Sequence, residues 1–171
     1  MSSGPDAGTQ GEAHGLPAAV VVASNRAAAG VYEDTTGPLI RDALRRLGFT
    51  TGEPAVVPDG APVGTAIRAA LDAGARVVLT TGGTGLTPTD RTPEVTRELL
   101  DREVPGIAEA IRAHGVAQGV PAAVLSRGLA GVVGECLVVN LPGSRGGVKD
   151  GLAVLEPVLV HAAEQVVGSD H

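Results

Sequence analysis

Short apolar runs limit the fold of this 171-residue chain more than any other feature of its sequence. Ala18–Ala23 (AAVVVA) has no polar side chain, and the segments ARVVLTT (75–81) and CLVVN (136–140) are nearly as apolar. A strand with one face in water alternates apolar and polar residues, whereas a strand that is covered on both faces does not. These runs therefore predict a central, mostly parallel sheet with helices on both faces.

Segments with helical spacing separate the apolar runs. Leu39, Ala43, Leu44 and Leu47 recur every three or four positions, and Gly48 is suited to end that helix. Further helices are expected at about 62–73, 93–101 and 106–114, and after 143 with a break at Pro157; a short strand is expected at 55–57, and a strand start followed by an irregular or hairpin segment at 121–135. Strands that alternate with helices in this way predict a three-layer α/β sandwich.

The length of the chain fits one domain. Residues 1–15 are rich in Ser, Gly, Asp and Gln without any periodicity, and we expect them to form a mobile N-terminal tail. Residues 16–168 are then expected to form a single α/β domain. The 25 glycines fall in turns rather than in a repeat, which indicates many tight connections.

The composition argues against several classes of protein. One Tyr, one Phe, no Trp and a net charge of −6 leave neither an aromatic platform nor a basic face for nucleic acid. Cys136 is the only cysteine, so no internal disulfide or cysteine-based zinc site can form. The sequence shows neither an apolar run of membrane-spanning length nor the pattern of a signal peptide. We therefore expect a cytoplasmic protein without membrane or nucleic-acid partners.

Polar, glycine-rich loops follow four of the expected strands, at the strand ends where open α/β sheets bind ligands. These loops read SNRAAAGVYEDTTGP, PDGAP, GGTGLTPTDRTPE and NLPGSRGG, and we expect them to meet at one edge of the sheet. Three of them carry an aspartate: Asp34, Asp59 and Asp90. This convergence is a stronger indication of a binding site than any one motif.

Two of these loops are suited to bind anions. Gly82, Gly83 and Gly85 would let backbone amides approach an anion, and Thr84 adds a hydroxyl group. The loop lacks the GK[ST] ending of a P-loop and does not fit the GxGxxG fingerprint, so a purely structural turn explains it equally well. Ser144 is placed to cap the last long helix, whose N-terminus would also attract an anion, although a simple cap is an equal alternative.

Aspartates beside anion-binding loops favour a magnesium ion, which a few carboxylates and the phosphates of a substrate can hold together. Each aspartate also has a plain structural explanation. Asp90 is suited to be a helix cap or to form an Asx-turn, and Asp59 in PDG suits an ordinary type I turn. Their combination on one expected edge favours the metal site.

In chain order, these segments resemble the MoaB/Mog family of molybdenum cofactor biosynthesis proteins, whose domain also occurs in gephyrin. The strongest motifs are LTTGGTG and TDRTPEVT. The stretches SNRAAAGVYEDTTGP, VPDG, VLSR and NLPGSRGGVKD are similar to further family segments in the same order. The resemblance runs from about Ala18 to Val167.

The resemblance implies a molybdopterin-binding α/β domain that assembles as a homotrimer or a dimer of trimers. The best-known members adenylylate the terminal phosphate of molybdopterin with Mg-ATP and release pyrophosphate, and a molybdenum-insertion protein acts next. By motif position, Asp59 and Asp90 are implied as the catalytic carboxylates that bind Mg²⁺. The residues implied in binding nucleotide or pterin are Ser24, Asp34, Gly82, Gly83, Thr84, Gly85, Ser126, Asn140, Pro142, Gly143 and Ser144.

Two positions depart from the family pattern. Asn25 stands where many members carry Asp, and Thr89 stands where an arginine often precedes the aspartate. The alternative function is therefore a non-catalytic molybdopterin-binding or carrier protein of the same fold. The basic residues that could neutralise anionic substrates, each of which is otherwise an ordinary surface residue, are Arg26, Arg91, Arg127, Arg145 and Lys149.

Overall fold

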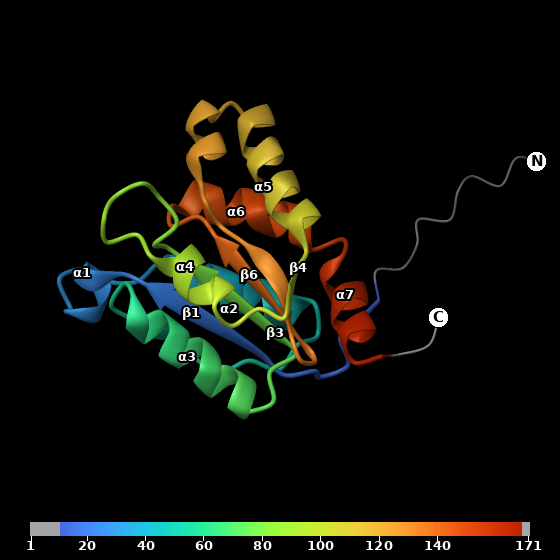
Figure 1. Cartoon of the computed structure of the whole chain (residues 1–171). Helices are drawn as coiled ribbons and strands as arrows, with labels where there is room; N and C mark the ends of the chain where they lie inside the picture. Colours follow the sequence, from blue (N-terminus) through green and yellow to red (C-terminus); the bar gives the residue numbers. More distant parts are fainter. Residues whose placement is uncertain (1–10, 169–171) are drawn as a thin grey trace, which may run out of the picture.

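A six-stranded sheet crosses the middle of the protein, and helices cover both of its faces (Figure 1). The computed structural model describes residues 11–168. Its strands are β1 (Ala18–Ala23), β2 (Ala55–Val57), β3 (Val77–Thr81), β4 (Arg102–Glu103), β5 (Ala130–Val133) and β6 (Cys136–Leu141). Its helices are α1 (Asn25–Ala28), α2 (Thr36–Arg46), α3 (Ala61–Asp72), α4 (Thr92–Arg97), α5 (Pro105–Ala117), the 3-10 helix η1 (Pro121–Leu125), α6 (Arg145–Leu155) and α7 (Leu159–Val166).

The strand order is β2-β1-β3-β6-β5-β4. Strands β2, β1, β3 and β6 run parallel, whereas β5 is antiparallel to both β6 and β4. Leu79 in β3 lies opposite Val20 in β1 and Val139 in β6. The chain leaves β1 for β2 on one side and then crosses to β3 on the other, which creates a switch point between β1 and β3 where such sheets bind ligands.

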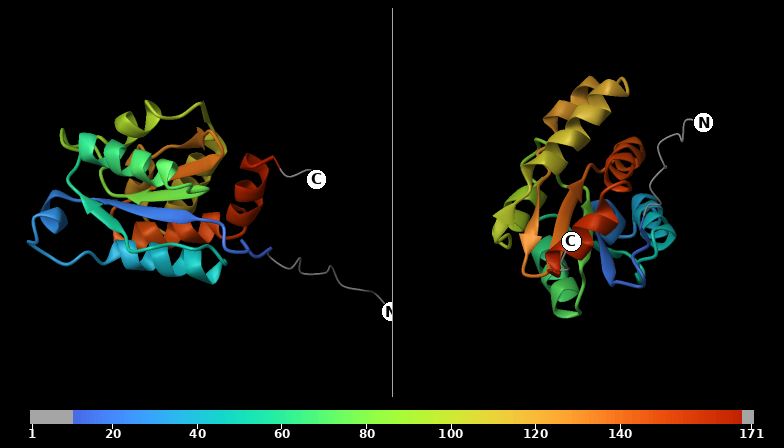
Figure 2. Two further views of the ribbon diagram at one scale, coloured as in Figure 1. Left: turned by 90° about the horizontal axis from the view of Figure 1, so that it is seen from below. Right: turned by 90° about the vertical axis from the view of Figure 1, so that its right-hand side faces the viewer.

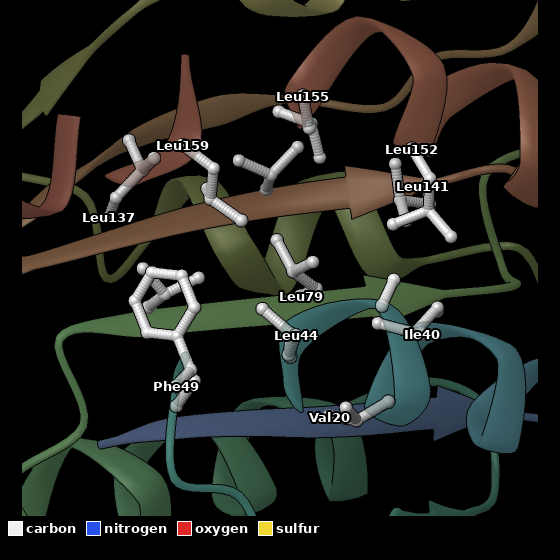
Figure 3. Packing of buried hydrophobic residues seen from close by; sticks show 14 of the residues in the cluster. Val20, Ile40, Leu44, Phe49, Leu79, Leu137, Leu141, Leu152, Leu155 and Leu159 are labelled. Carbon is white, nitrogen blue, oxygen red and sulfur yellow. The ribbon is translucent and has the colours of Figure 1, made fainter. Parts of the chain in front are cut away.

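Two apolar clusters hold the layers together. Successive side chains in a strand point to opposite faces, so β1 sends Val20 into one cluster and Val21 into the other. Helices α2, α6 and α7 pack on one face with buried Leu44, Leu155 and Leu159 (Figure 3). Helix α3 covers the opposite face, and the side view in Figure 2 shows the sheet between these helices. Burial on both faces explains why the strands lack alternation.

The three-layer α/β fold predicted from the sequence is confirmed. The break at Pro157 is also confirmed, because α6 ends at Leu155 and α7 begins at Leu159. Within the described residues, none of the helices combines the length and the apolar character needed to cross a membrane.

The strand start expected near residue 121 is wrong, because this segment forms the 3-10 helix η1. Pro121 has no amide hydrogen for a strand ladder, and its fixed backbone angle suits the first turn of a helix. Ala123 N donates to the Val120 carbonyl at 3.0 Å, and Ser126 N donates to the Ala123 carbonyl at 3.2 Å. The hairpin expected as one alternative for this region forms farther along the chain, where β5 and β6 pair as antiparallel neighbours.

The expected N-terminal tail requires a correction at residues 11–15, while residues 1–10 lie outside the described residues. Ala13 is only 2% exposed, and its amide donates to the Leu47 carbonyl at 2.8 Å. Gly15 N donates to the Gly48 carbonyl, also at 2.8 Å. These bonds pair carbonyl groups that the end of α2 leaves free, so the segment belongs to the folded unit.

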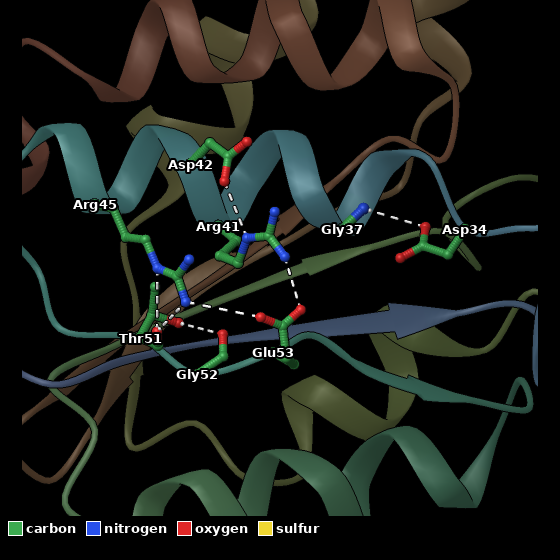
Figure 4. A network of polar contacts seen from close by, with 8 residues as sticks. All are labelled: Asp34, Gly37, Arg41, Asp42, Arg45, Thr51, Gly52 and Glu53. Carbon is green, nitrogen blue, oxygen red and sulfur yellow. Dashed lines mark hydrogen bonds and ion pairs between the residues drawn. The ribbon is translucent and has the colours of Figure 1, made fainter.

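Polar contacts fix both ends of α2 relative to the sheet (Figure 4). At its C-terminal half, Arg41 pairs with Glu53 at 2.7 Å, and Arg45 Nη2 donates to the Thr51 carbonyl at 2.9 Å. At its N-terminus, Asp34 Oδ1 accepts from the amide of Gly37 at 3.1 Å. The carboxylate of Asp34 is thereby held at the edge where the parallel strands end.

The central position of Leu79 makes it a test of the packing. It is fully buried between the two neighbouring strands and the α2 layer, so we expect Leu79→Ala to lower the free energy of unfolding by about 2–5 kcal/mol through cavity formation. Val31→Ala at a side chain that is 71% exposed should change it by less than about 0.5 kcal/mol. Urea denaturation monitored by circular dichroism measures the free energy of unfolding of both variants. Equal changes in the two variants would contradict the central packing position of Leu79.

Candidate active site

The ends of β1, β3 and β6 bring their following loops into contact. Thr81 Oγ1 at the end of β3 donates to the Pro142 carbonyl after β6 at 2.7 Å. A Cβ atom built on Gly143 would lie 3.2 Å from the Cα atom of Gly82, so the two loops pass each other closely. The expectation that these loops meet at one edge of the sheet is confirmed.

Glycine is required at two positions of the loop after β3. Gly82 has φ of 88°, and a Cβ atom there would lie 2.2 Å from the carbonyl oxygen of Ala23. Gly83 has φ of 66°, and its Cβ atom would lie 2.3 Å from Thr92 Oγ1 and 3.0 Å from Asp59 Oδ1. Residues with a side chain rarely adopt this left-handed backbone conformation, and a side chain at either position would also collide with its neighbours. The glycines therefore let the loop lie against the end of β1 and the start of α4.

A cavity of about 550 Å³ opens on one side of the glycine loop, and we call it the large cavity. Its wall is mostly apolar, with Ile111 from α5, Leu125 from η1 and the exposed Leu86 among its side chains. This size and character suit a small-molecule ligand. The sequence-predicted site residues that line it are Gly83, Thr84, Gly85, Asp90, Ser126, Pro142, Gly143 and Ser144.

The first turn of α6 forms the floor of the large cavity. Ser144 Oγ accepts from the Gly147 amide at 3.0 Å, so Ser144 caps the helix as expected. Gly146 and Gly147 border the same cavity, and amides at a helix N-terminus attract anions. Elsewhere in the lining of the large cavity, Ser126 Oγ donates to Thr84 Oγ1 at 3.4 Å.

A second cavity of about 320 Å³, the small cavity, lies at the switch point between β1 and β3. Ser24, Asp34 and Gly82 line it, all three predicted from the sequence. Ser24 Oγ accepts from the amide of Ala27 at 3.2 Å and lies 2.9 Å from the Tyr32 hydroxyl. Gly143 borders both cavities, so the two spaces adjoin beside the glycine loop.

Asp59 and Asp90 lie close enough to influence each other. Burial raises the pKa of the Asp59 carboxyl above its usual value, and the negative charge of Asp90 raises it further. Asp59 Oδ1 is buried without a hydrogen-bond partner. Asp90 Oδ2, in contrast, accepts from the amide of Thr87 at 3.0 Å and from its hydroxyl at 2.8 Å, so the carboxylate folds back on the turn that precedes it and does not form an Asx-turn.

Asn25 holds the loop that carries Asp59. Its Oδ1 atom accepts from the Asp59 amide at 2.9 Å, which joins the loops after β1 and β2. An aspartate at this position could accept the same hydrogen bond with a carboxylate oxygen, so this contact does not depend on a charge. The departure from the family pattern at Asn25 is therefore compatible with the arrangement of the site.

The chemistry of the two carboxylates fits a magnesium ion that would share its remaining positions with oxygens of a bound ligand. Mg²⁺ binds through one or two carboxylates together with phosphates and water. An unpartnered oxygen on Asp59 and the repulsion from Asp90 are both relieved by a cation between them. Across residues 11–168 no group of three or more His, Cys, Asp or Glu side chains forms a metal cage, so substrate would have to supply further ligands.

Asn140 lies behind the site instead of lining either cavity. It is 3% exposed, and its Nδ2 atom donates to the hydroxyl oxygens of Thr80 at 2.9 Å and Thr96 at 3.1 Å. Its Oδ1 atom accepts from the Leu129 amide at 3.0 Å. The amide group is thus occupied within the protein, which corrects the expectation that Asn140 contacts the pterin pocket.

The predicted basic residues occupy different places. Arg145 borders the small cavity and donates to the Thr35 carbonyl at 3.4 Å, whereas Lys149 borders a groove between α2 and α6. Arg127 contacts the loop after β3 through its side chain. Arg26 and Arg91 line neither cavity.

The sequence did not reveal several residues that border the cavities. Tyr32 lines the small cavity, and Arg112 and Asp150 contribute the charged groups of the large cavity besides Asp90. Thr92 is fully buried beside the glycine loop with an unpartnered hydroxyl. These side chains lie in helices or in the connection after β1, and helical spacing alone does not show which side chain faces a cavity.

Comparison with known proteins identifies the class to which this fold and site belong. Residues 19–161 match the family model described as a probable molybdopterin binding domain. The chain is 40% identical over 168 residues to a molybdenum cofactor biosynthesis bifunctional protein of Synechococcus elongatus, covering 98% of this chain and 52% of that protein. The chain therefore spans about half the length of that relative.

Two further relatives match over most of their own length. A molybdopterin adenylyltransferase of Pyrococcus furiosus is 38% identical, with 83% of this chain and 86% of that protein covered. The solved structure of the molybdopterin biosynthesis Mog protein from Mycobacterium ulcerans is 51% identical, covers 88% of this chain and 99% of its own, and superposes with a TM-score of 0.84. The chain belongs to the MoaB/Mog family of molybdenum cofactor biosynthesis proteins.

The environment of Asp59 gives a prediction about stability. Its raised pKa in the folded state means that the ionised carboxylate disfavours folding at neutral pH, and that this penalty disappears below the usual pKa of Asp. We expect Asp59→Asn to raise the free energy of unfolding of the metal-free protein at pH 7, with a gain that shrinks as the pH falls toward about 3.5. Urea denaturation in a chelating buffer measures the gain.

The matched control is Glu109→Gln, which removes an exposed carboxylate on α5. It should not reproduce the pH-dependent gain of Asp59→Asn. A lower stability of Asp59→Asn than of the wild type at pH 7 would contradict this account of the half-buried carboxylate.

Proposed function

We propose that the protein is a molybdopterin adenylyltransferase that transfers the adenylyl group of Mg-ATP to the terminal phosphate of molybdopterin. A phosphate oxygen of molybdopterin would attack the α-phosphorus of ATP, the bond between that phosphorus and the oxygen bridging to the β-phosphate would break, and pyrophosphate would leave. The observation that carries this proposal is the pair of adjoining cavities that share Gly143, with Asp59 and Asp90 beside the glycine loop.

The geometry of the cavities supports two different ligands. The large cavity has a mostly apolar wall that suits a flat heterocycle such as a pterin, and the first turn of α6 offers amides for its phosphate. The small cavity lies at the switch point of the sheet, where α/β proteins commonly bind nucleotides. Arg145 adds a positive charge at the border of this second space.

The proposed transfer needs positioning and charge neutralisation more than a covalent nucleophile. Asp59 and Asp90 would hold the magnesium ion, which supplies positive charge to the phosphates when it is bound. The amides of the glycine loop would bind phosphate oxygens, and the apolar wall would exclude water. Cys136 is unsuited to act as a nucleophile, because it lies in β6 and burial raises the pKa of its thiol to about 12.

The names of relatives support the same activity. The protein of Pyrococcus furiosus is a molybdopterin adenylyltransferase, and this chain covers 86% of it. We propose that Mg²⁺, ATP and molybdopterin are the ligands of this site, that the protein acts in the cytoplasm, and that a molybdenum-insertion protein uses its product.

We also propose a homotrimer, or a dimer of two trimers. The support from the structure is a group of exposed apolar side chains on two packed elements, α5 and η1, which project from one end of the molecule (Figure 1). Val116 in α5, Val120 in the connection between the two helices, and Val124 and Leu125 in η1 are between 45% and 63% exposed. Clustered apolar side chains at a surface are typical of contacts between proteins.

The direct test incubates the wild-type protein with molybdopterin and Mg-ATP and measures adenylylated molybdopterin and pyrophosphate. Asp59→Asn and Asp90→Asn should each abolish most product while the proteins stay folded, because each removes a carboxylate that would hold the metal. Saturable binding of molybdopterin to folded wild type without product would instead support the carrier alternative. Absence of both binding and product would refute both functions.

Gly85→Ala tests the position of Asp90 without removing its carboxylate. A Cβ atom at residue 85 would lie 2.7 Å from Asp90 Oδ2, and Gly85 does not have a positive φ. We expect kcat/KM for adenylylation to fall on the order of 100-fold because the carboxylate must move.

The matched control is Gly106→Ala in the first turn of α5, where a Cβ atom would meet nothing within 4 Å. Alanine also has a higher helix propensity than glycine, so the substitution should not disturb α5. It should keep wild-type activity. Full activity of folded Gly85→Ala would show that the observed position of Asp90 is not needed for the reaction.

A further inference from the structure

The side chain of Arg127 joins both ends of the turn that carries Asp90. Its Nε atom donates to the Gly85 carbonyl at 2.8 Å, and its Nη2 atom donates to the Asp90 carbonyl at 2.8 Å. Its backbone amide also donates to the Thr84 carbonyl at 2.9 Å. Arg127, which follows η1 in the chain, thus contacts both the glycine loop at Thr84 and Gly85 and the turn at Asp90. These residues lie more than thirty positions before it in the sequence.

Glu94 holds the guanidinium group of Arg127 in place. Arg127 Nη1 donates to Glu94 Oε1, and this contact holds the pKa of the Glu94 carboxyl below its usual value. Glu94 lies in the first turn of α4, directly after the loop that Arg127 contacts. The guanidinium therefore uses three nitrogen atoms on three different acceptors, which only its planar, forked shape allows.

A second arginine fixes the backbone from which Arg127 extends. Arg112 Nη1 in α5 donates to the carbonyls of Ser126 at 3.2 Å and Gly128 at 3.1 Å, the residues on either side of Arg127. Ser126 also lines the large cavity. The segment that carries Arg127 is thus anchored to the wall of the large cavity, and its side chain reaches from that wall to Asp90.

We propose that Arg127 is a positioning residue that fixes the glycine loop and Asp90 relative to the wall of the large cavity, with Glu94 orienting its guanidinium group. The kinetic part of this inference rests on the proposed adenylyl transfer, whereas the structural part does not. Arg127 contacts backbone carbonyls and Glu94 and does not line the large cavity, so it would act through the residues that it holds. A shift of about 1 Å in a reacting group can lower a rate on the order of 100-fold.

The experiment compares wild type with Arg127→Met, Arg127→Lys and Glu94→Gln by hydrogen exchange and by steady-state kinetics. In the ligand-free protein, we expect amide exchange in residues 82–91 to become about tenfold faster in Arg127→Met, since charge-assisted hydrogen bonds are lost. In the adenylylation assay, kcat should fall on the order of 100-fold in Arg127→Met. Arg127→Lys and Glu94→Gln should lie between Arg127→Met and wild type, because each keeps part of the contact.

The matched control is Arg97→Met, which removes an exposed arginine of α4 that pairs with Glu103 and does not contact the loop. It should leave both the exchange of residues 82–91 and kcat unchanged. If Arg127→Met does not fold by circular dichroism, Arg127→Lys and Glu94→Gln decide the test.

The outcomes separate the two levels of the proposal. Unchanged exchange in residues 82–91 together with an unchanged kcat in folded Arg127 variants would overturn the positioning role. If residues 82–91 exchange faster in Arg127→Met but the wild-type protein makes no adenylylated product, the positioning role is supported and the adenylyltransferase function is refuted. Faster exchange with unchanged kcat would overturn the catalytic importance of this contact.

Discussion

The parallel pairing of β3 with β1 on one side and β6 on the other is the interaction on which both the core and the site depend. These strands are buried on both faces, so their register is set by two apolar layers at once. Because they are parallel, their carboxyl ends emerge at one edge, and every loop of the candidate site starts from that edge. A change in this pairing would therefore disturb the core and, at the same time, move the loops of the candidate site apart.

Backbone, more than side chains, builds the site at this edge. The loop after β3 meets the end of β1 at Gly82, where a larger residue would collide, and passes the loop after β6 at Gly143, where a Cβ atom would be in tight contact. The amides that could bind anions are therefore fixed by the sheet and by the capped start of α6. The acidic pair and Arg127 then add charge to a frame that the main chain has already defined.

The site also retains buried polar atoms that lack partners. In the part of the chain that the structure describes, the buried side-chain oxygens without a hydrogen bond are Asp59 Oδ1, Thr92 Oγ1 and Glu94 Oε2. All three belong to the loop after β2 or to the first turns of α4, beside the glycine loop. Buried polar atoms are normally paired, so their concentration here is consistent with the proposed binding site beside the glycine loop.

The sequence alone determined the four parallel strands, the positions of most helices and the edge at which the loops meet, because apolar runs, helical spacing and glycine positions are local patterns. It did not predict β4, the strand order or the C-terminal ends of α4 and α5. The family motifs also predict Asp59 and Asp90 as the metal-binding carboxylates, which stays a prediction. Only the tertiary structure revealed η1 as a cavity wall, Asn140 as a buried hydrogen-bonding group behind the site, and the contact of Arg127 with the Asp90 turn. These three features depend on which segments, far apart in the sequence, pack against each other. A local sequence pattern does not encode the direction in which a side chain points toward a distant segment.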